Sequence, residues 1–96
     1  MELTARVAGL IRTIFDWDGN LYPEFATIED GIARKIRHCE SNIEIERGWK
    51  GAASTIKAWE ADAAELREIL ARLTAAAGNE IRHEVAVHNI MEVAGV

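Results

Sequence analysis

The sequence predicts an all-α fold, a small helical bundle in which a short N-terminal helix and a short C-terminal helix flank a long antiparallel helical hairpin. Apolar residues recur at helical spacing in several separate stretches, and turns that contain glycine divide these stretches. The connections are short, which favours antiparallel neighbours. The 96 residues, of which 49% are hydrophobic and 28% charged, are enough for one globular domain over residues 1–96.

The most regular helical pattern runs from residue 52 to residue 77. Two interleaved sets of apolar residues, each with a spacing of seven, form an a/d stripe that needs a partner helix. We call this stripe the seam and expect it to pack inside the hairpin or between two copies of the chain. Its residues are Ile56, Trp59, Ala63, Leu66, Leu70 and Leu73. The charged residues between them are expected to face solvent: Lys57, Glu60, Asp62, Glu65, Arg67, Glu68 and Arg72.

Helical spacing of apolar residues from Leu3 to Ile14 predicts a first helix over residues 2–15. The helix is expected to stop at the turn-rich segment 16–24, which holds the only proline. A second helix is predicted after Thr27, because Thr27 and Asp30 resemble a capping box.

The second helix is expected to continue through about Arg47, where the segment Gly48-Trp49-Lys50-Gly51 ends it. The pair Gly78-Asn79 then ends or kinks the long helix. We predict a short final helix from Glu80. A strand over residues 84–93 is the alternative, because valines alternate there.

The net charge is −5, with 16 acidic and 11 basic residues. This balance argues against a nucleic-acid partner, which a basic patch would attract. A single cysteine, Cys39, excludes an intrachain disulfide and lies on an apolar stripe, so we expect it in the core. No signal peptide or transmembrane span is evident, so no membrane partner and a cytoplasmic location are expected, with leaderless secretion left open.

The segment IFDWDGNL, residues 14–21, resembles the aspartate motif of the haloacid-dehalogenase-like phosphohydrolases, in which an apolar strand ends in Asp-x-Asp-Gly-Thr-Leu. The resemblance implies Asp16 as nucleophile and Asp18 as acid/base, with magnesium between carboxylate and phosphate. Asn20 stands in place of the threonine, and the rest of the chain is too short for the parallel sheet of that family.

His83 and His88 resemble the zinc-protease motif HExxH with one residue too many. Residues five apart diverge by roughly 140° around a helix and cannot share one zinc ion. We therefore expect surface or partly hydrogen-bonded histidines, and neither a metal nor a cofactor.

Trp49-Lys50-Gly51 between two helices resembles the WxG family of small helical hairpins, and the resemblance covers residues 26–96. It implies export without a cleaved leader and assembly as a homodimer or heterodimer. The export signal of that family is a tyrosine with an acid four residues on, and here His88 and Glu92 occupy the comparable places.

We expect a non-enzymatic protein–protein interaction module, either a small acidic adaptor or a stoichiometric inhibitor of the phage type, that binds a basic surface on a larger protein. The WxG-like secreted hairpin is the alternative, and a phosphohydrolase fragment is the remote alternative. A homodimer is also expected. The loop aromatics are either lids on the core or anchors for the partner. The expected partner-binding residues are Trp17, Tyr22, Phe25, Trp49, Glu60, Glu65 and Glu68.

Overall fold

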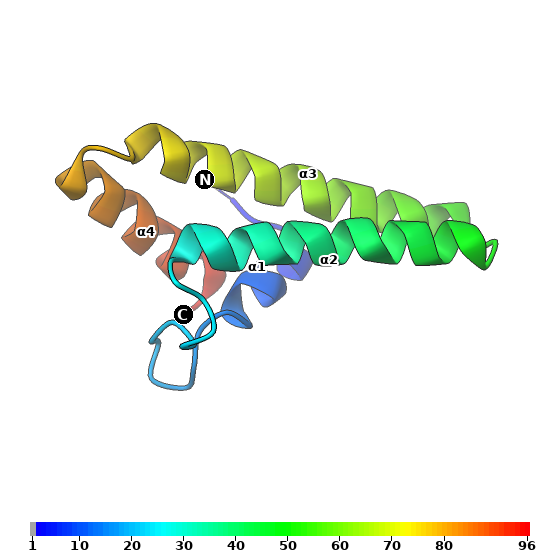
Figure 1. Ribbon diagram of the computed structural model, residues 1–96, viewed down its shortest axis with the longest axis horizontal. Helices are drawn as coiled ribbons and strands as arrows, with labels where there is room; N and C mark the ends of the chain where they lie inside the picture. The colour runs from blue at the N-terminus through cyan, green and yellow to red at the C-terminus, as the bar shows by residue number, and fades with distance from the viewer. Residues whose placement is uncertain (1) are drawn as a thin grey trace.

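The computed structural model describes residues 2–96 and forms a bundle of four helices, as the sequence predicts (Figure 1). The helices are α1 (Ala5–Arg12), α2 (Ile28–Gly48), α3 (Ala53–Ala76) and α4 (Glu80–Ala94). The two long helices α2 and α3 form the antiparallel hairpin, and α1 and α4 pack near one end of it. The other end projects as a two-helix arm, so the molecule is elongated, measuring 45 × 26 × 21 Å.

The predicted helix boundaries at α2 and α4 are confirmed by their capping contacts. The Thr27 hydroxyl accepts a hydrogen bond from the backbone N–H of Asp30 at 3.1 Å, which is one half of a capping box, and the Asp30 carboxylate accepts one from the N–H of Ala26 at 3.3 Å. The Asn79 side chain accepts one from the N–H of Arg82 at 3.0 Å, and Gly95 ends α4 in the left-handed conformation. Residues 84–93 are therefore helical, and the alternative of a strand is wrong.

The prediction of a first helix over residues 2–15 is wrong at both ends, because α1 spans only Ala5–Arg12. Thr4 caps its start, accepting a hydrogen bond from the N–H of Val7 at 3.2 Å. Beyond Arg12 the chain turns, and Ile14 and Phe15 are buried from a loop. The carbonyl of Ile14 accepts a hydrogen bond from Tyr22 at 3.1 Å, and Phe15 forms an isolated bridge with Leu21. Both side chains are buried. Apolar residues can be buried from a loop as well as from a helix, so their spacing alone predicted a helix that was too long.

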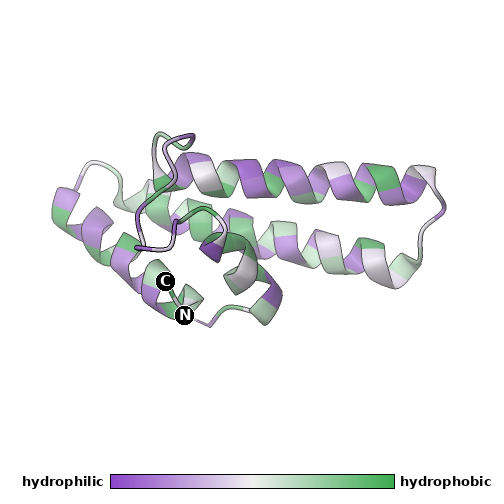
Figure 2. Cartoon of the chain, turned by 90° about the horizontal axis from the view of Figure 1, so that it is seen from below, coloured by the Kyte–Doolittle hydropathy of each residue, from purple (hydrophilic) through white to green (hydrophobic). Residues whose placement is uncertain are grey.

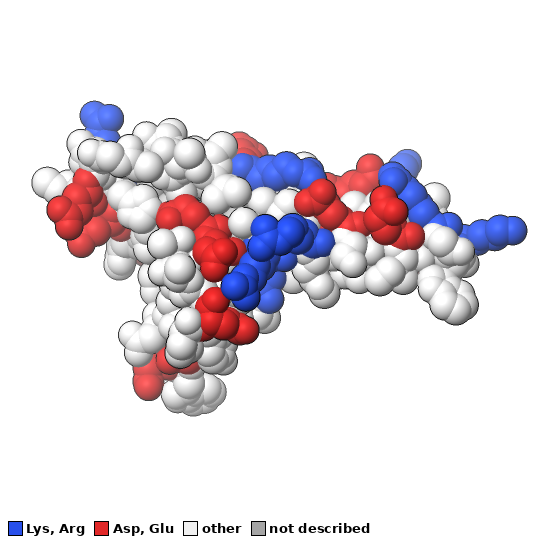
Figure 3. Space-filling model, in the orientation of Figure 1, with Lys and Arg blue, Asp and Glu red and all other residues white. Residues whose placement is uncertain are grey.

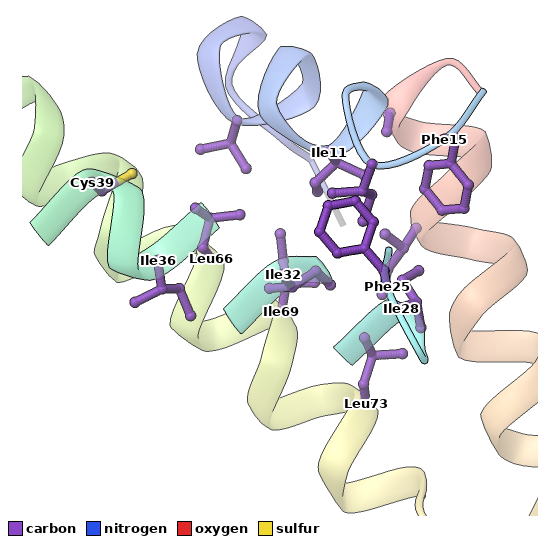
Figure 4. Close-up of a cluster of buried hydrophobic side chains, with 14 of the residues drawn as sticks. Ile11, Phe15, Phe25, Ile28, Ile32, Ile36, Cys39, Leu66, Ile69 and Leu73 are labelled. Carbon is purple, nitrogen blue, oxygen red and sulfur yellow. The ribbon is translucent and has the colours of Figure 1, made fainter. Parts of the chain in front are cut away.

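The hydrophobic core lies where α1 and α4 meet the hairpin (Figure 4). Figure 2 shows hydrophobic residues on the inward sides of the helices and hydrophilic residues on their outer sides. The largest side chains with almost no exposed surface come from all four helices and from the loop after α1: Val7, Ile11, Ile14, Ile32, Leu66, Ile69, Leu73 and Ile90.

The seam packs inside this chain, mainly against α2. Ala63, Leu66 and Leu73 are buried, while Ile56, Trp59 and Leu70 are partly exposed. The three buried residues cannot contact a second copy unless the bundle opens. Ile69 lies outside the predicted stripe and is only 2% exposed. Because α3 contacts α1 and α4 as well as α2, its buried face is wider than an a/d stripe.

Asp62 is the main correction on α3, because it is 4% exposed although the sequence pattern placed it on the solvent face. Its Oδ2 atom accepts hydrogen bonds from Nε of Arg6 at 2.9 Å and lies 2.8 Å from Nη2, which ties α1 to α3. These contacts raise the pKa of the Arg6 guanidinium. The guanidinium also lies 5.0 Å from the centre of the Trp59 ring.

Gly31 marks the closest approach of α2 to the loop after α1. A Cβ atom at this position would lie 3.0–3.3 Å from three atoms of the Ile14 side chain, including Ile14 Cβ. Gly48, near the end of the same helix, has no such neighbour within 4 Å. Gly31 therefore permits a close contact, although glycine costs helix stability.

Replacing Arg6 by leucine is expected to lower the free energy of unfolding by about 1–3 kcal/mol, because Asp62 then stays buried without its partner. Urea unfolding followed by far-UV circular dichroism measures this. The double variant Arg6→Leu/Asp62→Leu is expected to recover most of the loss. A double variant as unstable as Arg6→Leu would show that the loss comes from packing and not from the unpaired carboxylate.

Alanine at Gly31 is expected to destabilise the protein by about 1–3 kcal/mol, because overpacking against Ile14 outweighs the gain in helix propensity. The matched variant Gly48→Ala adds the same methyl group to open space and is expected to stabilise by up to about 1 kcal/mol. Thermal unfolding of the two variants side by side tests the contrast. Stabilisation by both would mean that the Ile14 contact carries no steric cost.

Candidate functional site

A groove of about 630 Å³ lies between α4 and the segment from Phe15 to Glu29. Its floor is apolar and its edges are polar, an arrangement typical of binding sites. The apolar lining residues are Phe15, Leu21, Ile28, Val87 and Met91, and the polar ones are Thr27, Glu29, His83, Glu84 and His88.

The side chains of His83 and Glu29 meet at the edge of this groove. His83 Nε2 lies 2.5 Å from Glu29 Oε1, which links α4 to the first turn of α2. His88 is more exposed and lies 3.8 Å from Glu92 on the same helix. The two histidines therefore have separate carboxylate partners, which fits the expectation of surface or partly hydrogen-bonded side chains.

The groove lies in the part of the molecule that carries the net negative charge. We call residues 13–33 and 73–96 together the acidic lobe. The lobe contains eight Asp or Glu residues and one Lys or Arg, whereas the rest of the chain contains eight acidic and ten basic residues. Figure 3 shows the basic side chains mainly over the hairpin. The net charge of −5 is therefore distributed unevenly over the structure.

The four aromatic residues predicted to contact a partner do not come together. Trp17 is 99% exposed in the loop after α1, and Trp49 is 83% exposed at the tip of the arm. Tyr22 is also exposed. Phe25 is buried in the core, with the Arg34 guanidinium 5.1 Å from its ring centre, so Phe25 is a lid and not a surface anchor.

The three glutamates predicted to contact a partner lie at different places along α3. Glu65 accepts two hydrogen bonds from Thr4, at 3.1 Å from its N–H and 2.8 Å from its hydroxyl, and so stabilises the start of α1. Glu68 lies 3.5 Å from Arg72. Glu60 lines a separate hollow on the hairpin, together with two further glutamates and with Arg47 and Arg67.

The acidic lobe and its groove were missed because two segments far apart in sequence form them. The signal that was available is the absence of any Lys or Arg between Arg12 and Arg34, in a segment with five acidic residues. That signal indicates a charge asymmetry, but only the docking of α4 brings the second acidic segment beside the first.

Asp16, which the phosphohydrolase resemblance assigned as nucleophile, organises a turn. Its Oδ1 atom accepts hydrogen bonds from the N–H groups of Asp18 and Asn20, both at 2.9 Å. The parallel sheet implied by that resemblance is absent from residues 2–96, where Phe15 and Leu21 form the only β pairing.

No protein-family model, no curated protein and no solved structure matches this sequence. Among the described residues, no helix combines the length and apolar character needed to cross a membrane. The same part of the chain holds no group of three or more metal-ligating side chains. The groove and the charge distribution are thus the observations from which a function can be argued.

Cys39 has no exposed surface, and burial raises the pKa of its thiol. At about pH 8 a thiol-specific reagent is expected to react with the native protein at least about 100-fold more slowly than with the urea-unfolded chain, because only opened molecules expose the thiolate. The raised pKa means that the folded state holds the proton more tightly. The stability contributed by Cys39 is therefore present below about pH 8.5 and falls as the pH rises further.

Equal rates of reaction in the native and unfolded protein would contradict this assignment of Cys39 to the core. The variant Cys39→Ala serves as the control, because it removes the only thiol and should show no reaction in either state.

Proposed function

We propose that this protein is a non-enzymatic interaction module, an acidic adaptor or stoichiometric inhibitor that binds a basic surface of a larger protein through its acidic lobe. The observation that carries the proposal is the coincidence of an apolar groove with the part of the chain that holds the excess negative charge. Apolar contact area supplies affinity, and charges around it supply steering and selectivity.

Exposed apolar side chains elsewhere in the acidic lobe support the same proposal. Ile81 is 75% exposed and Val85 is 54% exposed, and the two residues are four apart on α4, so they lie on one side of the helix. Trp17 is fully exposed in the same lobe, at a separate hollow beside Val96. An exposed apolar pair such as Ile81 and Val85 is a surface that a partner can cover.

A WxG-like secreted hairpin protein is the second candidate, and the hairpin turn favours it. Trp49 and Gly51 lie at the tip of the α2–α3 hairpin, where that resemblance requires them. Release of the protein into the culture medium from intact cells tests this candidate, and strict retention in the cell would contradict it.

A pull-down of tagged protein from host lysate tests the proposed function. We expect one dominant partner at low salt whose capture falls at least about fivefold at about 500 mM salt, because the Debye length is then below about 5 Å. The variant Glu80→Gln/Glu84→Gln, in the lobe, should reduce capture to a similar extent. The matched variant Glu40→Gln/Glu44→Gln removes the same charge from exposed sites on the hairpin and should retain the partner.

Two outcomes would contradict the proposal. Recovery of the tagged protein alone, at low salt and without a partner, would indicate self-assembly or a role that needs no partner. Equal loss of the partner in both double variants would show that overall charge, and not the acidic lobe, controls binding.

A further inference from the structure

We propose that the groove binds an amphipathic helix of the partner protein, with apolar side chains on one face and Lys or Arg beside that face. This inference rests on the proposed function and specifies the chemistry of the segment that is bound. The length of the groove, its lining and the charges at its edge each support it.

The length of the groove fits a helix of the partner. Lining residues on α4 extend from His83 to Met91, which corresponds to about 12 Å, or two helical turns. Helices that lie in grooves typically insert side chains at positions i, i+3 or i+4, and i+7, which span about two turns. The volume of about 630 Å³ has room for several such side chains.

The floor of the groove suits aliphatic side chains. Phe15 and Val87 provide rigid apolar surface, and Met91 provides a flexible side chain that adapts to the shape of its neighbour. Phe15 points from the loop toward α4 (Figure 4), so loop and helix form the two walls. A side chain of the bound helix that entered between these walls would lose contact with water and gain apolar contacts with both walls.

The charges at the edge determine which helix fits. Glu84 provides a carboxylate and Glu29 a second one, whose Oε1 atom also contacts His83, and none of the lining residues is Lys or Arg. Lys or Arg beside the apolar face of a bound helix would lie near these carboxylates, while acidic residues would add repulsion. The wider lobe has the same sign of charge, with eight acidic residues and Arg82 as its one strongly basic residue.

The tip of the arm also presents apolar side chains beside basic ones, as the proposed partner helix would, but over a smaller surface. Ile45 and Trp49 are exposed four residues apart, with Arg47 and Lys50 beside them. This surface spans about one helical turn, or 6 Å, which is half the length of the groove. The dimensions therefore favour a helix of a partner over the tip of a second copy.

The test uses three peptides of about 18 residues, long enough to form amphipathic helices on binding. The first has leucine on one face and lysine on the other, the second has glutamate in place of lysine, and the third has the composition of the first with the leucines dispersed. Isothermal titration measures the dissociation constants, and nitrogen-15 NMR of the full chain locates the site. We expect the leucine–lysine peptide to bind at least about tenfold more tightly than the other two and to shift the amides of Phe15, Ile28, Val87 and Met91.

A matched pair of variants separates the groove from general charge attraction. Glu84→Lys and Glu44→Lys both replace an exposed glutamate on a helix and change the net charge equally, but only Glu84 lines the groove. We expect Glu84→Lys to weaken binding of the leucine–lysine peptide at least about fivefold and Glu44→Lys to weaken it less than about twofold. Circular dichroism of the two variants serves to check that both are folded.

Three results with the purified protein, and one with a captured partner, would overturn the inference. The first is equal weakening by the two variants, and the second is a set of NMR shifts that avoids the groove. The third is self-association in the absence of peptide that Trp49→Ala abolishes, since this would assign the groove to the arm of a second copy. If a partner captured from lysate still binds Glu84→Lys unchanged, the inference about the groove fails. Capture that remains salt-sensitive would then leave the proposed function standing, because the partner would contact the acidic lobe outside the groove.

Discussion

The contact between α2 and α3 is the interaction on which the rest of the structure depends. The two helices bury the apolar stripes that face each other, but they are longer than the other two helices, and α1 and α4 cover them near one end only. The arm therefore exposes Ile45 and Trp49. At the covered end, α1 and α4 complete the core with Ile11 and Ile90.

Polar contacts determine how the short helices dock on the hairpin. Arg6 pairs with the buried Asp62, and Glu65 caps the start of α1, so α3 holds α1 through two carboxylates. His83 pairs with Glu29 between α4 and α2. Apolar packing alone is tolerant of small rotations, whereas hydrogen bonds with defined partners specify an orientation. The polar contacts thus position the walls of the groove.

The groove exists because the acidic loop after α1 and helix α4 do not close on each other completely. The turn around Asp16 directs Phe15 and Leu21 toward α4, and the space between them stays open to solvent. An apolar concavity in a region with excess negative charge favours ligands that are both apolar and positively charged. This combination links the fold of the lobe to the proposed binding of a basic amphipathic helix.

The number and type of the helices follow from local features of the sequence, because apolar periodicity, caps and glycine turns act over a few residues. Thr27, Gly48 and Gly78 each lie at or beside a helix boundary where local chemistry predicts one. Tertiary contacts were needed to bury Asp62, to bring Ile14 and Phe15 into the core from a loop, and to join two acidic segments in one lobe. The burial of Asp62 and the lobe depend on contacts between residues more than fifty positions apart, such as Arg6 with Asp62 and Glu29 with His83. Helical periodicity indicates which side of a helix is apolar, but it does not indicate which neighbour covers that side.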